Sequence, residues 1–92
     1  MHITVELFGA ARLKAGVKEL ALSLPIPATA SQLADALARS CPALVGDIVR
    51  PDRSGLVESY TLNLNGLRFI SSDPVFLLPG DKLLLFSSQA GG

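Results

Sequence analysis

Hydrophobic and polar residues alternate at the start of the chain, a pattern typical of strands with one buried face. In residues 2–8 every second side chain is apolar, namely Ile3, Val5 and Leu7. Phe8 departs from this pattern, because it is a large aromatic residue on the otherwise polar face. Residues 17–24 alternate in the same way, and residues 9–16 form only a short connection. The two segments therefore predict a hairpin.

The middle of the chain predicts one helix over residues 30–40. Thr29 as N-cap with Gln32 three positions later matches a capping box. An apolar stripe follows at a spacing of four, formed by Leu33, Leu37 and Cys41. Pro42 ends the helix, since the residue before a proline avoids the α region.

The second half of the chain predicts three more strands. Residues 58–65 alternate, and Asn65-Gly66 is the pair preferred in a type I′ hairpin turn. Residues 67–70 are then expected to form the return strand. Residues 82–87 are apolar at four consecutive positions, which is typical of a central strand covered on both faces. These positions are Leu83, Leu84, Leu85 and Phe86.

The predicted order is therefore β-β-α-β-β-β, and the expected fold class is α+β. We expect a mixed sheet of four to five strands wrapped around one main helix. A chain of 92 residues has room for a single domain. Residues 1–87 are assigned to this domain, and residues 88–92 to a flexible C-terminal tail that ends in Gly-Gly.

Composition and charge exclude several classes of protein. The chain is 49% hydrophobic and only 17% charged, which argues against disorder. Eight basic residues balance eight acidic ones, without a run of Lys or Arg, so we expect no nucleic-acid partner. No apolar run approaches the ~18 residues of a membrane span, and no signal peptide is evident. With one cysteine and hence no internal disulfide, a cytoplasmic location is expected.

Candidate catalytic and metal-binding residues are few. His2 and Cys41 are the only residues of their kinds, so a four-ligand Cys/His zinc site is not expected. We interpret His2 as a surface residue and Cys41 as a small apolar residue of the helix stripe. Three aspartates show no special spacing and are expected to be solvated, namely Asp35, Asp47 and Asp52. The sequence thus predicts no catalytic residues and no metal site, and the chain is not expected to be an enzyme.

The end of the chain carries the strongest candidate chemistry. Gly91 and Gly92 follow shortly after the predicted central strand. Glycine has no Cβ, so a Gly-Gly carboxylate can enter a slot where a side chain would clash. Five residues beyond Ser87 reach at most ~17 Å when extended. From the residues alone, both a frayed end and a tail that enters a partner's active site remain open.

Several motifs occur in the same order as in a known family. They are residues 5–12 (VELFGAAR), residues 29–37, residues 64–66 (LNG), residues 78–83 (LPGDKL) and the terminal Gly91-Gly92. This ordered set resembles the MoaD/ThiS family of sulfur carriers, which belongs to the ubiquitin-like β-grasp superfamily. The resemblance covers nearly the whole chain, and it is nearest to the small subunit of molybdopterin synthase.

The resemblance implies a carrier and not a catalyst. An E1-like enzyme would adenylate the Gly92 carboxylate with ATP and magnesium, and the chain itself would bind no cofactor. A sulfur donor would then displace AMP and leave a thiocarboxylate at Gly92. Gln89, Ala90 and Gly91 would thread into the active site of each partner. In the molybdopterin branch, the second partner is the large subunit of the synthase, where the sulfur is used to build the molybdenum cofactor.

A partner interface follows from the same resemblance. The first and last strands of a β-grasp are neighbours, so Phe8, Leu84 and Phe86 are expected to cluster on the sheet face away from the helix. An exposed apolar patch usually marks an interaction site. Arg12 would add a polar contact at its rim. The alternative is that one or two of these residues are partly buried under a loop.

The sequence also departs from the family pattern. Prolines that often precede the terminal glycines of molybdopterin carriers are absent, and residues 50–58 form an extra loop. Carriers for cysteine, thiamine or another sulfur-containing metabolite therefore remain alternatives. A ubiquitin-like modifier joined to lysines through Gly92 is a further one. So is an interaction domain with an incidental Gly-Gly.

Overall fold

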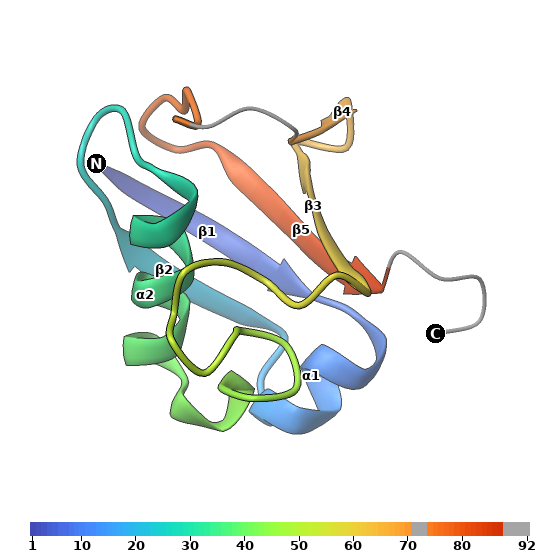
Figure 1. The fold of residues 1–92 in the computed structure, drawn as a ribbon. Coiled ribbons are helices and arrows are strands. Elements are labelled where there is room, and N and C mark those ends of the chain that lie inside the picture. The colour runs from blue at the N-terminus through green and yellow to red at the C-terminus, as the bar shows by residue number, and fades with distance from the viewer. Residues whose placement is uncertain (71–73, 88–92) are drawn as a thin grey trace.

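The computed structural model describes residues 1–70 and 74–87. Its five strands and three helical segments follow one another along the chain (Figure 1). They are β1 (His2–Leu7), α1 (Gly9–Ala15), β2 (Glu19–Ser23), α2 (Ala30–Ser40), the 3₁₀ helix η1 (Pro42–Leu44), β3 (Tyr60–Leu64), β4 (Arg68–Phe69) and β5 (Lys82–Ser87). No helix in residues 1–70 and 74–87 is long and apolar enough to cross a membrane.

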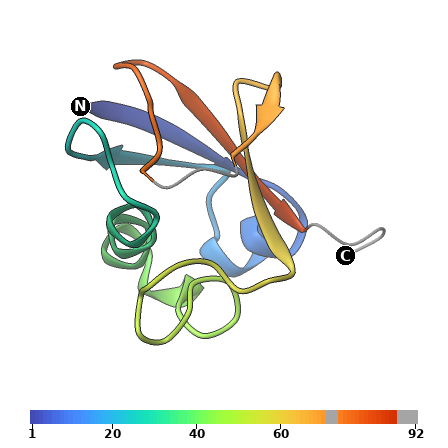
Figure 2. The same ribbon diagram turned by 45° about the horizontal axis from the view of Figure 1, so that its top comes forward.

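The strands form one mixed sheet in the order β2-β1-β5-β3-β4. β1 and β5 run parallel, whereas the other neighbours are antiparallel. β5 is therefore central, as its apolar sequence predicts. Both helices lie on the same side of the sheet, which leaves the other side open (Figure 2). The expected α+β class and mixed sheet are confirmed. We call the side toward α2 the inner face and the other the outer face.

The main helix has the predicted bounds because its capping box is complete. The Thr29 hydroxyl accepts a hydrogen bond from the Gln32 backbone N–H (3.0 Å), and the Gln32 side chain accepts one from the Thr29 N–H (2.8 Å). Two backbone donors that the first helical turn leaves unpaired are satisfied in this way. Pro42 follows the C-cap Cys41 and begins η1 instead of extending α2.

The prediction of a simple connection over residues 9–16 is wrong, because this segment contains helix α1. Its N-cap, Phe8, makes no side-chain capping bond, and Gly9 has a positive φ of 57°. Only Ala11 is buried, so the helix shows no apolar stripe. Gly16 ends it in the left-handed conformation, with its N–H bonded to the Arg12 carbonyl. The sequence thus contains a glycine that marks the end of this helix, but no capping residue that marks its start.

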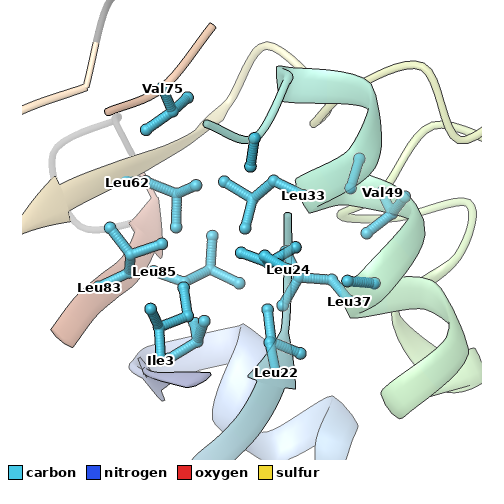
Figure 3. Close-up of a cluster of buried hydrophobic side chains, with 14 of the residues drawn as sticks. Ile3, Leu22, Leu24, Leu33, Leu37, Val49, Leu62, Val75, Leu83 and Leu85 are labelled. Atoms are coloured by element: carbon cyan, nitrogen blue, oxygen red, sulfur yellow. The ribbon is translucent and has the colours of Figure 1, made fainter. Parts of the chain in front are cut away.

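The core lies between the inner face and α2 (Figure 3). Most of the inward residues predicted from the strand pattern are buried, with Val5 and Leu7 fully enclosed, whereas Leu20 and Tyr60 are half-buried. Leu33 and Leu37 from α2 face the sheet residues Leu62 and Leu85. The segment after α2 completes the core with Leu44, Ile48 and Val49. The sequence pattern of Leu44, Val45, Ile48 and Val49 suggests a short helical turn packed on the core, but the 3₁₀ helix η1 lies earlier and ends at Leu44.

The β3–β4 hairpin contains the predicted turn and one extra residue. Asn65 and Gly66 both have positive φ (55° and 75°), and the Leu67 N–H donates to the Leu64 carbonyl (2.9 Å). In the ladder, however, Leu64 pairs with Arg68. Leu67 is therefore a bulge residue, and every later side chain moves to the opposite face.

The observed β4, Arg68–Phe69, is shorter than the predicted strand over residues 67–70. β2 and β3 are also shorter at their ends than the predicted segments over residues 17–24 and 58–65.

The outer face of β5 is less buried than the sequence predicts. Leu83 and Leu85 are fully buried on the inner face. Leu84 and Phe86 point to the outer face and are only half-buried. None of the helices in the described part of the chain covers this side of the sheet (Figure 2). The expectation that β5 is covered on both faces is therefore wrong for its outer face.

Candidate functional site

Three phenylalanine rings form a row across the outer face of the sheet. Phe86 on β5 lies in the middle, with its ring centroid 6.2 Å from that of Phe8 and 5.8 Å from that of Phe69. Both contacts are edge-to-face, a favoured arrangement of aromatic rings. We call Phe8, Phe86 and Phe69 the aromatic row. Phe69 is the most exposed of them, at 56% of its surface.

The residues expected to form the interface come together on this face. Leu84 lies two positions before Phe86 on β5 and is half-buried. Phe8 directly follows β1, the parallel neighbour of β5, and its N–H donates to the Leu85 carbonyl (3.1 Å). The clustering predicted from strand adjacency is therefore present. Phe86 contacts the side chain of Phe69, a residue that the sequence prediction did not include. We call the aromatic row together with Leu84 the outer patch.

Arg12 lies at the rim of the outer patch. Its guanidinium carbon is 5.4 Å from the centroid of the Phe8 ring, within cation–π distance. Its Nε donates to the Leu7 carbonyl (2.8 Å), and one terminal nitrogen lies 3.6 Å from the Glu6 carboxylate. These contacts fix the position of a cation beside an apolar surface.

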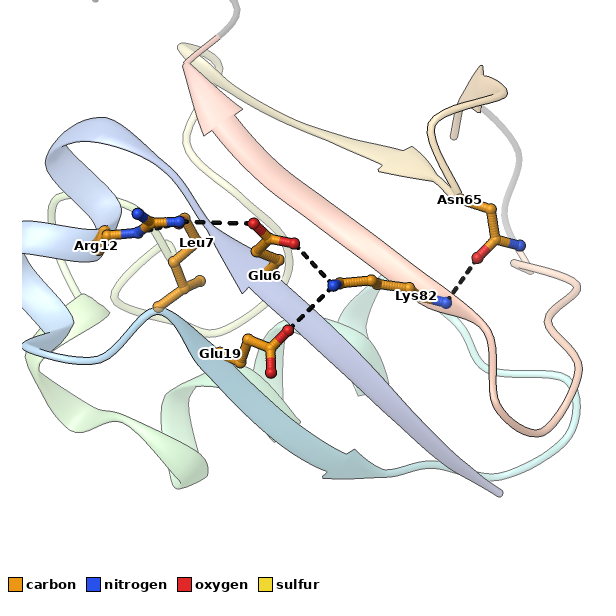
Figure 4. A network of polar contacts seen from close by, with 6 residues as sticks. All are labelled: Glu6, Leu7, Arg12, Glu19, Asn65 and Lys82. Atoms are coloured by element: carbon orange, nitrogen blue, oxygen red, sulfur yellow. Dashed lines mark hydrogen bonds and ion pairs between the residues drawn. The ribbon is translucent and has the colours of Figure 1, made fainter.

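A chain of charges continues from Arg12 across the sheet (Figure 4). The Lys82 ammonium lies 2.8 Å from the Glu6 carboxylate and 3.0 Å from that of Glu19. The Lys82 backbone N–H donates to the Asn65 side chain (2.8 Å), which ties the network to the hairpin turn. Glu6 thus stands between two cations.

The network shifts the pKa values of its members in opposite directions. The hydrogen bond from Lys82 lowers the pKa of Glu6, and the charges of Lys82 and Arg12 lower it further. The hydrogen bonds to Glu6 and Glu19 raise the pKa of Lys82. Both shifts favour the charged forms, so the outer face keeps its ion pairs at neutral pH.

Glu6→Gln is expected to destabilise the fold at neutral pH and to have little effect in acid. The ordinary pKa of this carboxyl is 4.5, and its pKa is lower in the folded protein. The stabilisation is therefore complete above the ordinary value and disappears as the pH falls through the folded value. Urea unfolding of both proteins, from neutral pH down to about pH 3, measures the difference in free energy of unfolding. A difference that stays constant over this range would contradict the prediction, and added salt is expected to reduce it.

The predicted tail residues lie outside the described part of the chain. These are Gln89, Ala90, Gly91 and Gly92, together with Ser88. β5 ends at Ser87, one residue after the centre of the aromatic row. The route to the C-terminus therefore starts at the edge of the outer patch. The division between a domain over residues 1–87 and a tail over residues 88–92 stays a prediction.

The remaining chemical candidates take part in no shared site. His2 is exposed at the start of β1, and Cys41 is half-buried at the C-cap of α2. The three aspartates engage surface neighbours: Asp35 pairs with Arg39 and Arg53, Asp47 with Lys14, and Asp52 accepts from Ser54. Among residues 1–70 and 74–87, no group of three or more His, Cys, Asp or Glu side chains is placed to hold a metal ion.

The sequence prediction missed three residues of the outer face. Glu6 and Lys82 lie on neighbouring strands, and their opposite charges on outward positions would have been a usable signal. Phe69 gave no such signal, because without the bulge at Leu67 it would face the core.

Comparisons with known proteins agree with this architecture. No protein-family model matches the sequence, and no curated protein sequence matches it significantly. Among solved structures, SAMP1 of Haloferax volcanii is 25% identical over 100% of both chains, with a TM-score of 0.80. A putative molybdopterin converting factor, subunit 1, of Pyrococcus furiosus is 23% identical, with a TM-score of 0.69 and 95% and 97% of the two chains covered. Urm1 of Trypanosoma brucei is 22% identical over 99% of this chain and 95% of its own, with a TM-score of 0.52.

The likeness to each of these structures extends over at least 95% of this chain. The expectation drawn from the ordered motifs is confirmed at this level. The chain has a ubiquitin-like β-grasp of the MoaD/ThiS type.

Proposed function

We propose that the chain is a non-catalytic carrier whose Gly92 carboxyl group is activated by an E1-like enzyme. Small ubiquitin-like proteins of this type serve as sulfur carriers or as protein modifiers, and both roles begin at the C-terminus. The observation that carries the proposal is a Gly-Gly end on a chain that matches SAMP1, a small archaeal modifier protein, along its whole length.

The chemistry begins at a carboxylate that is a poor electrophile. The Gly92 carboxylate attacks the α-phosphorus of ATP in the activating enzyme, pyrophosphate leaves, and an acyl-adenylate forms. A sulfide equivalent then attacks the carbonyl carbon, AMP leaves, and a thiocarboxylate remains. Magnesium and ATP belong to the activating enzyme, and this chain supplies the carboxylate, the narrow Gly-Gly end and a surface that holds it in place.

The outer patch is the proposed docking surface for that enzyme. It is apolar and rimmed by the Arg12 cation, and it lies beside the point where β5 ends. Docking there would put the start of the tail next to the partner, and five extended residues could carry Gly92 up to ~17 Å toward its active site. Gln89, Ala90 and Gly91 are the segment that would thread.

For the sulfur acceptor, we propose the pathway to the molybdenum cofactor. Support comes from the motifs over residues 5–12 and 78–83, which resemble the small subunit of molybdopterin synthase. The fold of the Pyrococcus furiosus molybdopterin converting factor subunit is consistent with it. The outer patch would then bind the large subunit of the synthase after it releases the activating enzyme.

Mass spectrometry of the C-terminus tests the carrier role. The chain is incubated with the E1-like enzyme of the same organism, ATP, magnesium and a sulfide source. We expect one oxygen of Gly92 to be replaced by sulfur. A chain that lacks Gly92 still ends in a glycine carboxylate, yet it is expected to remain unchanged. A wild-type terminus that is unaltered would contradict the proposal and favour an interaction domain with an incidental Gly-Gly.

A modifier role is the second candidate, and the full-length likeness to SAMP1 favours it. The first step is the same up to the acyl-adenylate. A lysine amine of a target protein then attacks in place of sulfide and forms an isopeptide bond. Peptides from cell extract that carry Gly92 on a lysine would establish this role.

A further inference from the structure

Asn63 is an unusual residue on the outer face. It lies on β3 between Leu84 of β5 and Phe69 of β4, directly opposite each in the ladders. Only 9% of its surface is exposed, whereas the other outward residues of the strands are half-buried or exposed. Its side-chain oxygen Oδ1 is buried and accepts no hydrogen bond within residues 1–70 and 74–87. A buried acceptor without a donor is costly, so its presence calls for an explanation.

The aromatic row explains how this atom becomes buried. β4 and β5 lie on either side of β3, so their backbones are about two strand spacings, or ~10 Å, apart. The rings of Phe69 and Phe86 are nevertheless only 5.8 Å apart. At least one of the two rings therefore leans over β3, where Asn63 and Thr61 point to the outer face. The buried acceptor thus belongs to a residue that lies between Leu84 and Phe69 of the outer patch and not at its edge.

Phe69 is the part of this cover that can move most easily. It is 56% exposed and belongs to a strand of two residues at the edge of the sheet. A partner that packs against the ring can therefore turn it aside without disturbing the core. Leu84 and Phe86 lie on the central strand and are held more firmly. A partner would therefore reach Asn63 from the side of β4.

We infer that Asn63 is a specificity-determining residue of the outer patch, whose Oδ1 accepts a hydrogen bond from an N–H group at the apolar centre of the activating enzyme's surface. The inference rests on the proposed function, in which the outer patch docks the E1-like enzyme. An apolar surface without a donor at this point would leave Oδ1 unpaired in the complex as well. Asn63 would thus distinguish the correct partner from other apolar surfaces.

Asn63→Leu is expected to have opposite effects on the stability of the free chain and on its binding to the activating enzyme. It removes an unpaired buried acceptor and keeps the size of the side chain, so we expect the Tm of the free chain to rise by about 4–8 °C. In the complex it leaves the donor of the enzyme unpaired. The KM of the activating enzyme for the chain is therefore expected to rise about tenfold, with kcat unchanged.

Two further variants serve as matched controls. Thr61→Val removes a polar group from the neighbouring outward position of β3 and is expected to leave KM unchanged. Asn63→Asp keeps an acceptor; we expect a lower Tm for the free chain and a KM near that of the wild type. KM and kcat are measured by ATP–pyrophosphate exchange with the purified E1-like enzyme of the same organism.

The outcomes separate the inference from the proposed function. If the enzyme adenylates the wild type and Asn63→Leu has the same KM, the inference is wrong and the proposed function stands. A fall in Tm for Asn63→Leu overturns it too, because the amide would then be paired in the free chain. If Thr61→Val and Asn63→Leu raise KM equally, the inference is also wrong. If the enzyme neither binds nor adenylates the wild type, the proposed function and the inference both fail.

Discussion

Phe86→Ala is expected to raise the KM of the activating enzyme for the chain by about 30-fold to 1,000-fold, while the chain stays folded. Phe86 lies in the middle of the aromatic row and contacts the rings on both sides. Large central side chains of an interface contribute about 2–4 kcal/mol each, and 1.4 kcal/mol corresponds to a factor of ten. ATP–pyrophosphate exchange measures KM, and thermal melting shows whether the variant is folded.

Phe76→Ala is the matched control for this prediction. Phe76 is also an exposed phenylalanine, at 67% of its surface, but it lies outside the aromatic row. Loss of this ring is expected to leave KM unchanged. If both variants bind as the wild type does, the outer patch is not the docking surface. If both lose affinity equally, the effect reflects general loss of apolar surface and not this site.

Leu85→Ala is expected to lower the free energy of unfolding by about 2–5 kcal/mol. Leu85 is fully buried on the central strand, and the alanine would leave a cavity between the sheet and α2. Domains of this size are stable by only about 5–15 kcal/mol, so a large share of the stability is at stake. Urea denaturation measures the change.

Leu84→Ala, one residue earlier on the same strand, provides the comparison. Leu84 points to the outer face and is half-buried, so its truncation removes less packing and leaves no enclosed cavity. We expect a loss well below that of Leu85→Ala. Equal losses would mean that the outer face is packed like a core, which would contradict the assignment of the outer patch as an open surface.

The elements with complete local signals were predictable from the sequence. α2 has a capping box before it and a proline after it, and its predicted bounds agree with the structure. β5 was predicted with its bounds and central place, because its inner and outer positions are both apolar. α1 was missed, since Phe8 and Gly9 offer no start signal and a single buried alanine gives no periodicity.

Only those residues of the outer patch that are placed by the pairing of neighbouring strands were predictable from the sequence. Phe8, Leu84 and Phe86 follow from the pairing of the first and last strands, which the resemblance implies. The burial of Asn63 could not be predicted, because it depends on how the side chains of β4 and β5, on either side of β3, pack over the outer face. Periodicity describes which face a residue occupies, and it carries no information on how long side chains cover that face.

The bulge at Leu67 affects how this protein is compared with its relatives. A relative that has the same turn without the extra residue would align well through Asn65 and Gly66. Beyond that point, a gap-free alignment would match the outward Phe69 with a residue that faces the core. After the turn, residues of this chain and of such a relative should be aligned when they lie on the same side of the sheet. This alignment needs a one-residue gap at the bulge. A length difference at this hairpin changes the composition of the outer surface, and it should not be treated as neutral loop variation.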